Sequence, residues 1–183
     1  MIGAEDREVE AMGAALRARI QHLFGRSLHV RHVDAGSCNA CESEIKLLTS
    51  PYYDIHRLGI FFTPAPRHAD LLLVTGPVTR AMDAPLRETY EAMPDPRLVV
   101  AVGACACDGG IFGASAFTRG GLARVLPVDV FIPGCPPAPL TLIHGLLLAL
   151  GRAKPGLRGQ TWVVPAGGAG AGHPREEAAW TET

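Results

Sequence analysis

An α/β fold with a flavodoxin-like, doubly wound parallel sheet of four or five strands is predicted for this chain of 183 residues. Apolar runs such as LLLVT and LVVAV are continuous rather than alternating, as in strands that are buried on both faces. Segments with helical spacing separate these runs, which is the α/β pattern. Hydrophobic residues make up 48% of the chain and charged residues 19%, so the chain can bury a core of its own.

The predicted elements follow one another along the chain. Apolar runs bounded by Gly and Pro indicate strands at 28–33, 60–63, 71–75, 98–102 and 128–132. Helices are expected between and after them at 41–48, 84–92 and 139–150. A short edge strand is expected at 162–164, before the glycine-rich run GGAGAG at 167–172.

An amphipathic helix is predicted at 5–24, because apolar residues recur there at steps of three and four. Two interpretations of this helix stay open: it packs on its own domain, or it is an arm that docks on a partner. The expected organisation is an N-terminal helix or arm at 1–25, one domain at 26–165, and a disordered tail at 166–183.

Composition excludes several classes of protein. The formal net charge of −1 offers no basic field for nucleic acid. The acidic N-terminus lacks the basic-then-apolar order of a secretory signal, and the longest apolar stretch, 140–150, is too short to cross a membrane. Without an export signal, the five cysteines are expected to stay reduced, which favours metal binding over disulfides.

All five cysteines follow the carboxyl ends of predicted strands. Cys38 and Cys41 come after the first strand, Cys105 and Cys107 after the fourth, and Cys135 after the fifth. In an open α/β sheet these ends face one common edge, where ligand crevices form. Residues far apart in the sequence are therefore expected to converge on one site.

Thiolates at such a site suit either zinc or an iron–sulfur cluster. Two CxxC knuckles would favour zinc, but the chain has only one. Single cysteines on separate glycine-rich loops can hold the corners of a larger cubane cluster, and glycine lets the backbone approach it closely. A cubane cluster, zinc and buried structural thiols stay open as interpretations, with the cluster favoured.

Four blocks of sequence carry a resemblance to a known family: VDAGSCNACESEI, PRHADLLLVTGPVTRAM, PDPRLVVAVGACACDGGIFG and PVDVFIPGCPPAP. They resemble the iron–sulfur small subunit of membrane-associated NiFe hydrogenases, of the formate hydrogenlyase type in particular. More distantly, they are similar to the homologous 20 kDa subunit of respiratory complex I. The match covers residues 25–151. Complex I subunits have two adjacent cysteines in the first block, whereas this chain has the CxxC of the hydrogenase branch.

The resemblance implies one 4Fe–4S cluster, held by Cys38, Cys41, Cys105 and Cys135. Cys107 replaces a small polar residue of the family pattern, and its interpretations are a buried hydrophobe or an alternative ligand. Glu44 matches a glutamate of the family, so a partner-facing or proton-route role and a helix N-terminal role both stay open. Glu42, next to Cys41, is expected to lie on a solvated face or to cap the helix.

The resemblance also implies the function. The chain would be an electron-transfer subunit beside a large subunit with the NiFe centre, because four cluster ligands leave one cysteine, too few for that centre. Electrons would leave through a ferredoxin-like subunit. The complex would include membrane subunits, which would place this chain peripherally on the cytoplasmic face of the inner membrane. The alternative is the equivalent subunit of a complex I-like NADH/quinone oxidoreductase without nickel.

Overall fold

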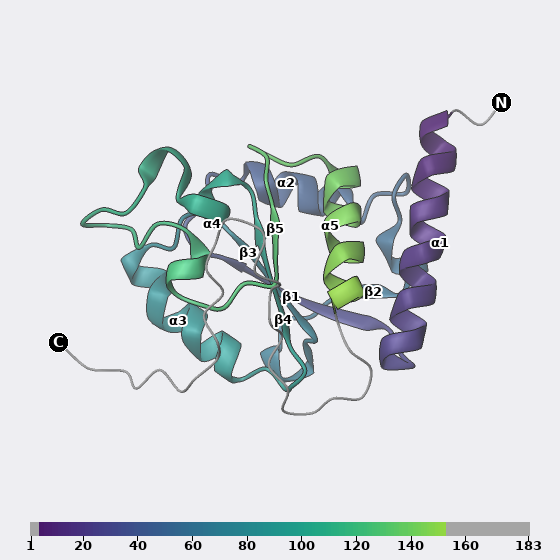
Figure 1. Cartoon of the computed structure of the whole chain (residues 1–183), viewed down its shortest axis with the longest axis horizontal. Coiled ribbons are helices and arrows are strands. Elements are labelled where there is room, and N and C mark those ends of the chain that lie inside the picture. Colours follow the sequence, from purple (N-terminus) through teal and green to yellow (C-terminus); the bar gives the residue numbers. More distant parts are fainter. Residues whose placement is uncertain (1–3, 153–183) are drawn as a thin grey trace.

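A five-stranded, all-parallel sheet forms the centre of the computed structural model, which describes residues 4–152 (Figure 1). Its strands are β1 (Leu28–Asp34), β2 (Ile60–Phe62), β3 (Leu71–Thr75), β4 (Leu98–Val102) and β5 (Val130–Ile132). They lie in the order β2-β1-β3-β4-β5. This is the flavodoxin-like order of a doubly wound sheet. The predicted fold class is therefore confirmed.

Helices cover both faces of the sheet (Figure 1). They are α1 (Ala4–Phe24), α2 (Ala40–Leu47), α3 (Arg80–Glu91), α4 (Ala104–Asp108) and α5 (Pro139–Arg152). Residues of α1, α2 and α5 share one hydrophobic cluster with one face of the sheet. Residues of α3 and α4 share a second cluster with the opposite face. The sheet is thus buried on both sides, as its continuous apolar runs predict.

The first helix packs on its own domain. In α1, Leu16 and Ile20 are buried in the same cluster as α5. The Arg19 side chain also donates from Nε to the carbonyl oxygen of Leu150, at 3.2 Å. These contacts tie the helix to the C-terminal end of α5. The structure therefore favours the first of the two interpretations of this segment.

Two predicted boundaries are wrong for local reasons. Helix α3 begins at Arg80 rather than at 84, so Pro85 lies inside it instead of marking its first turn. The chain is held at that start by the Thr79 N–H, which donates to the Ala35 carbonyl at 3.0 Å. Strand β5 begins at 130 rather than at 128, because Asp129 uses its side chain to accept the Val99 N–H at 2.7 Å.

Two further expectations concern other parts of the chain. The short helix α4, in the loop after β4, was not predicted. The predicted edge strand 162–164 and the tail 166–183 lie outside the described residues. Within residues 4–152, none of the helices is both long enough and apolar enough to span a membrane.

Candidate metal centre

The three cysteine-bearing loops meet at the carboxyl edge of the sheet. They follow β1, β4 and β5. In the strand order, β1 and β4 lie on either side of β3, and β5 lies beside β4. Backbone hydrogen bonds join the second and third loops. The Gly103 N–H donates to the Ile132 carbonyl and the Ala104 N–H to the Gly134 carbonyl, both at 2.8 Å. The predicted convergence on one sheet edge is therefore present.

Four of the thiols lie within electrostatic range of one another. The pKa of the Cys41 thiol is raised to about 12, chiefly by burial and then by Glu42 and the thiols of Cys38, Cys105 and Cys135. Burial also raises the pKa of Cys105, followed by the influence of Cys135 and Cys38. Cys41 and Cys105 are half-buried, whereas Cys38 and Cys135 are exposed. The structure thus brings together the four predicted ligands.

The fifth thiol lies apart from this group. Cys107 packs against the second hydrophobic cluster, and its Sγ lies 3.9 Å from the Ala101 carbonyl oxygen. Its pKa is raised to about 11, chiefly by burial and then by Asp108, while a backbone hydrogen bond at Ile132 lowers it; Cys105 is the one thiol that acts on it. This placement matches the interpretation of Cys107 as a small buried hydrophobe.

Two glycines make room for the sulfurs. A Cβ atom on Gly103 would lie 2.6 Å from the Cys41 Sγ, and one on Gly110 would lie 3.0 Å from the Cys105 Sγ. Both residues have positive φ angles, 86° and 53°, which side chains rarely adopt. Glycine at these positions therefore lets the backbone close around the thiols without displacing them.

The donor set fits an iron–sulfur cluster. Thiolates are the ligands that such clusters take, usually four at a time. Each charged neighbour that raises the pKa of Cys41 is itself an acid or a thiol, so ionising all four thiols concentrates negative charge that a metal core would balance. Within residues 4–152, no three His, Cys, Asp or Glu side chains gather tightly enough for a site with a single metal ion.

The expectation of a solvated or capping Glu42 is wrong. Glu42 is only 7% exposed, and the Thr75 hydroxyl donates to its Oε1. The helix-capping position is held by Asn39, which makes no side-chain capping bond. Glu44 is half-buried on the same helix. The sequence signal for Glu42 is weak, because an acid in a first helical turn is most often exposed.

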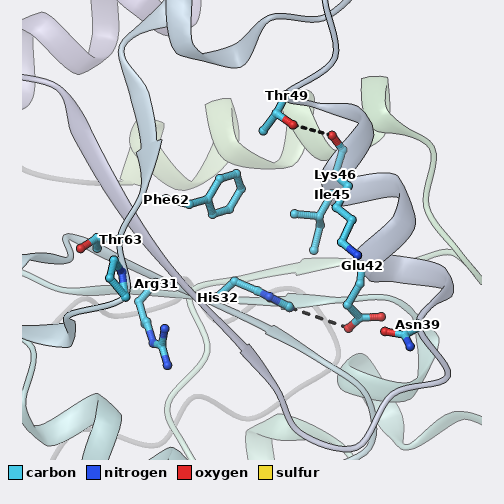
Figure 2. A pocket seen from close by; sticks show the side chains of 10 residues that line it. Arg31, His32, Asn39, Glu42, Ile45, Lys46, Thr49, Phe62 and Thr63 are labelled. Atoms are coloured by element: carbon cyan, nitrogen blue, oxygen red, sulfur yellow. Dashed lines mark hydrogen bonds and ion pairs between the residues drawn. The ribbon is translucent and has the colours of Figure 1, made fainter.

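A pocket of about 440 Å³ opens beside Glu42 (Figure 2). Phe62 and Ile45 form apolar walls, and His32 points toward the Glu42 carboxylate, with 3.7 Å between Nε2 and Oε1. Arg31, at its rim, points away from both (Figure 2). No sequence pattern indicated this pocket, since its walls come from α2, β1, β2 and the chain after β2.

Large apolar side chains are exposed on the loop after α4. Ile111 is 93% exposed, Phe112 55% and Phe117 81%. The loop is nevertheless well held, because Arg119 pairs with Asp83 at 2.6 Å and its N–H donates to the Val78 carbonyl at 2.6 Å. Exposed apolar side chains on an ordered loop make this loop a candidate interaction surface.

Known proteins resemble this chain over most of its length. A probable membrane-bound hydrogenase subunit, mbhJ, of Pyrococcus furiosus is 46% identical over 78% of this chain and 86% of its own length. Formate hydrogenlyase subunit 7 of Escherichia coli is 45% identical over 80% of this chain, which spans only 56% of that protein. A chain of the membrane-bound sulfane sulfur reductase, an archaeal respiratory membrane complex, superposes with a TM-score of 0.62 at 33% identity, covering 77% of this chain and 75% of that one.

The model of one protein family matches residues 38–149, which contain four of the five strands and all the cysteines. That family is the 20 kDa subunit of NADH ubiquinone oxidoreductase. The resemblance to hydrogenase and complex I subunits is confirmed by these matches. The chain belongs to the family of the 20 kDa subunit of NADH ubiquinone oxidoreductase, together with subunits of hydrogenase complexes.

Proposed function

We propose that this chain is the electron-transfer iron–sulfur subunit of a hydrogenase-type complex, with one 4Fe–4S cluster bound by four cysteines. The ligands are Cys38, Cys41, Cys105 and Cys135. The observation that carries the proposal is the convergence of these thiols from three strand ends onto one sheet edge, with glycine where a Cβ atom would meet a sulfur. Family membership supports it.

The chain's own residues would hold and shield the cofactor. Such a cluster supplies one-electron transfer when it is bound. Cys41 and Cys105 would bind from half-buried positions and Cys38 and Cys135 from the exposed side. The backbone at Gly103 and Gly110 would pack closely against it. No thiol of the set would be left as a free nucleophile, so the chain would relay electrons and not act as an enzyme by itself.

A large subunit would cover the exposed side of this edge. Support comes from the exposed thiols and from the apolar loop with Ile111, Phe112 and Phe117. The expected contact surface comprises the loops 34–44, 75–82, 103–113 and 133–139. A ferredoxin-like subunit would take the electrons onward, and membrane subunits would hold the complex at the cytoplasmic face of the inner membrane.

The type of reaction depends on the large subunit. The hydrogenase reading draws support from the relative of Pyrococcus furiosus, of which this chain covers 86%. The second candidate, a nickel-free complex I-like assembly, draws support from the family match itself. A neighbouring gene for a large subunit with two CxxC motifs would favour the hydrogenase reading, and one without them the other.

Anaerobic reconstitution of the full chain with iron and sulfide tests the cofactor. We expect about four iron and four sulfide per chain, since a cubane has four of each. Metal analysis of protein isolated without air distinguishes the alternative. One zinc per chain with no iron would refute the cluster and favour a zinc-stabilised binding module.

A further inference from the structure

The buried carboxylate of Glu42 lies in a short chain of hydrogen bonds that joins three elements. Thr75, at the end of β3, is fully buried and donates its hydroxyl proton to Oε1 of Glu42 on α2. His32, on β1, places Nε2 at 3.0 Å from the Thr75 Oγ1. A threonine hydroxyl has one proton to donate. Because Glu42 takes that proton, His32 must donate from Nε2.

His32 takes part in this chain as a neutral group. Burial is the largest influence on His32 and lowers its pKa, while Glu42 and Asp34 act in the opposite direction and Arg31 lowers it further. A neutral imidazole with its proton on Nε2 donates to the threonine and leaves Nδ1 without a proton. The direction of the hydrogen bonds, from His32 through Thr75 to Glu42, is therefore determined by the three groups themselves.

Burying the Glu42 carboxylate destabilises the fold unless other interactions compensate for the lost hydration. Removing a carboxylate from water is unfavourable unless partners replace the lost hydration. The Oε2 atom of Glu42 is buried without a hydrogen-bond partner within the described residues. An alanine would avoid this cost if the residue only filled space. Glu42 therefore calls for a reason connected with its position, directly after Cys41.

Helix α2 needs a tertiary anchor at its first turn. Asn39, at the capping position, has a φ of 70° and makes no side-chain capping bond. The buried apolar anchors, Ile45 in the helix and Leu48 directly after it, lie toward its far end, whereas Cys41 is only partly buried against the same cluster. Near the start, the bond from Thr75 to Glu42 connects the helix to the central strands. Without it, the turn that carries Cys41 would lose its side-chain hydrogen bond to the central strands.

We propose that Glu42, Thr75 and His32 form a positioning cluster that fixes the first turn of α2, and with it the Cys41 sulfur beside Gly103. This inference rests on the proposed function. None of the three residues would bind the metal. Their role would be to hold one ligand in the geometry that four-point attachment requires, since ligands are oriented by the groups behind them.

The test uses the full chain, reconstituted anaerobically with iron and sulfide. Thr75→Val removes the hydroxyl at nearly constant shape, and Thr75→Ser restores it. We expect Thr75→Val to lose iron to a chelator about tenfold faster, the size of effect expected for a lost hydrogen bond to a charged group, and to change the EPR line shape of the reduced cluster. Thr75→Ser should resemble the parent. Thr89→Val, on the outer side of α3, is the matched control.

Glu42→Gln separates position from charge. The glutamine carbonyl can still accept the Thr75 proton, but it has no charge. A positioning role predicts the parental EPR line shape and iron retention for Glu42→Gln. A change as large as that of Thr75→Val would mean that charge, not position, is what matters, and would overturn the proposal. So would parental behaviour of Thr75→Val.

The outcome remains interpretable if a variant folds poorly. Should Thr75→Val not fold, His32→Phe removes the donor to Thr75 and is expected to give a smaller change in the same direction. Unchanged iron retention and an unchanged EPR line shape in His32→Phe would then count against the cluster of three. Failure of the parent chain to take up iron and sulfide would contradict the proposed function instead, and is seen before any variant is made.

Discussion

The two central strands and the carboxyl edge of the same sheet differ in how completely the chain covers them. Every residue of β3 and β4 is buried, and the two strands pair in register from Leu71 with Leu98 to Thr75 with Val102. Beyond the carboxyl ends of the strands, Ile111 after β4 is 93% exposed and Cys135 after β5 is exposed. Within residues 4–152 the interior is thus covered, whereas the edge presents exposed thiols and apolar side chains.

Composition does not explain this difference. Both regions consist of small and apolar residues, with valine and alanine in β4 and alanine, glycine and isoleucine in the loop that follows it. What separates them is their place relative to the ends of the strands. Parallel strands are covered by helices along their length, but their carboxyl ends open onto a crevice. Stability and function should therefore respond to different substitutions.

The largest expected effect lies at the edge of the sheet. It is the difference in cluster binding between serine variants of two cysteines that are two residues apart. Cys105→Ser should prevent or convert the cluster, because one of four thiolate ligands is lost. Cys107→Ser should keep the cluster, since this thiol packs against the second hydrophobic cluster. Iron and sulfide analysis with EPR after reconstitution measures both. A cluster that survives Cys105→Ser but not Cys107→Ser would reverse the ligand assignment.

In the interior, the effect should fall on stability instead. Leu72, in β3, is fully buried, and Leu72→Ala is expected to lower the free energy of unfolding by about 2–5 kcal/mol through lost burial and a cavity. Denaturant titration of the reduced chain measures it. Leu148→Ala, at a side chain that is 54% exposed, should change it by less than about 0.5 kcal/mol. Equal effects of the two would contradict the interior placement of β3.

A charge on the apolar loop should weaken partner binding without lowering stability. Phe112 is 55% exposed, so Phe112→Asp has little burial to lose within this chain. We expect at least about a tenfold loss of affinity for the large subunit, because a buried charge would replace an apolar contact. Co-purification and binding titration measure this. Phe61→Asp, on the edge strand β2 and 40% exposed, is the control. Equal losses from both would argue against a specific docking loop.

The smallest expected effect concerns the ion pairs that join this loop to the covered side of the sheet. Burial alone would raise the pKa of Asp83, but hydrogen bonds from Arg87 and Arg119 outweigh it and hold the pKa below its ordinary value of 3.8. The stabilisation is therefore present above pH 3.8 and is lost as the pH falls through the lower value of the folded state.

Asp83→Asn should accordingly lower the free energy of unfolding at neutral pH by about 1 kcal/mol, since its arginine partners are partly exposed. The difference in the free energy of unfolding between Asp83→Asn and the parent should become smaller in acid. Unfolding measured across pH 2–7 gives this difference. Asp95→Asn, at a more exposed pair with Arg97, is the control and should have a smaller effect. A difference that does not change with pH would show that the charge of Asp83 is not the cause.

Much of the fold follows from local pattern. The segments LLLVT and LVVAV are strands with the predicted limits, because a continuous apolar run is stable in an extended form only where both faces are covered. The sequence equally predicted that the five cysteines follow the ends of strands. The parallel fold then brings four of them to one edge, as topology requires.

The sequence by itself thus determined the class of fold and the family, and it predicts the set of thiols. Only the tertiary structure decided which side chains act together across elements. No pattern within a single segment of the sequence predicts that Glu42 turns inward to Thr75, that Cys107 lies against Ala101, or that α1 packs on α5. The physical reason is that burial and hydrogen-bond partners depend on contacts between distant segments, whereas strands and helices reflect the period of the residues within one segment.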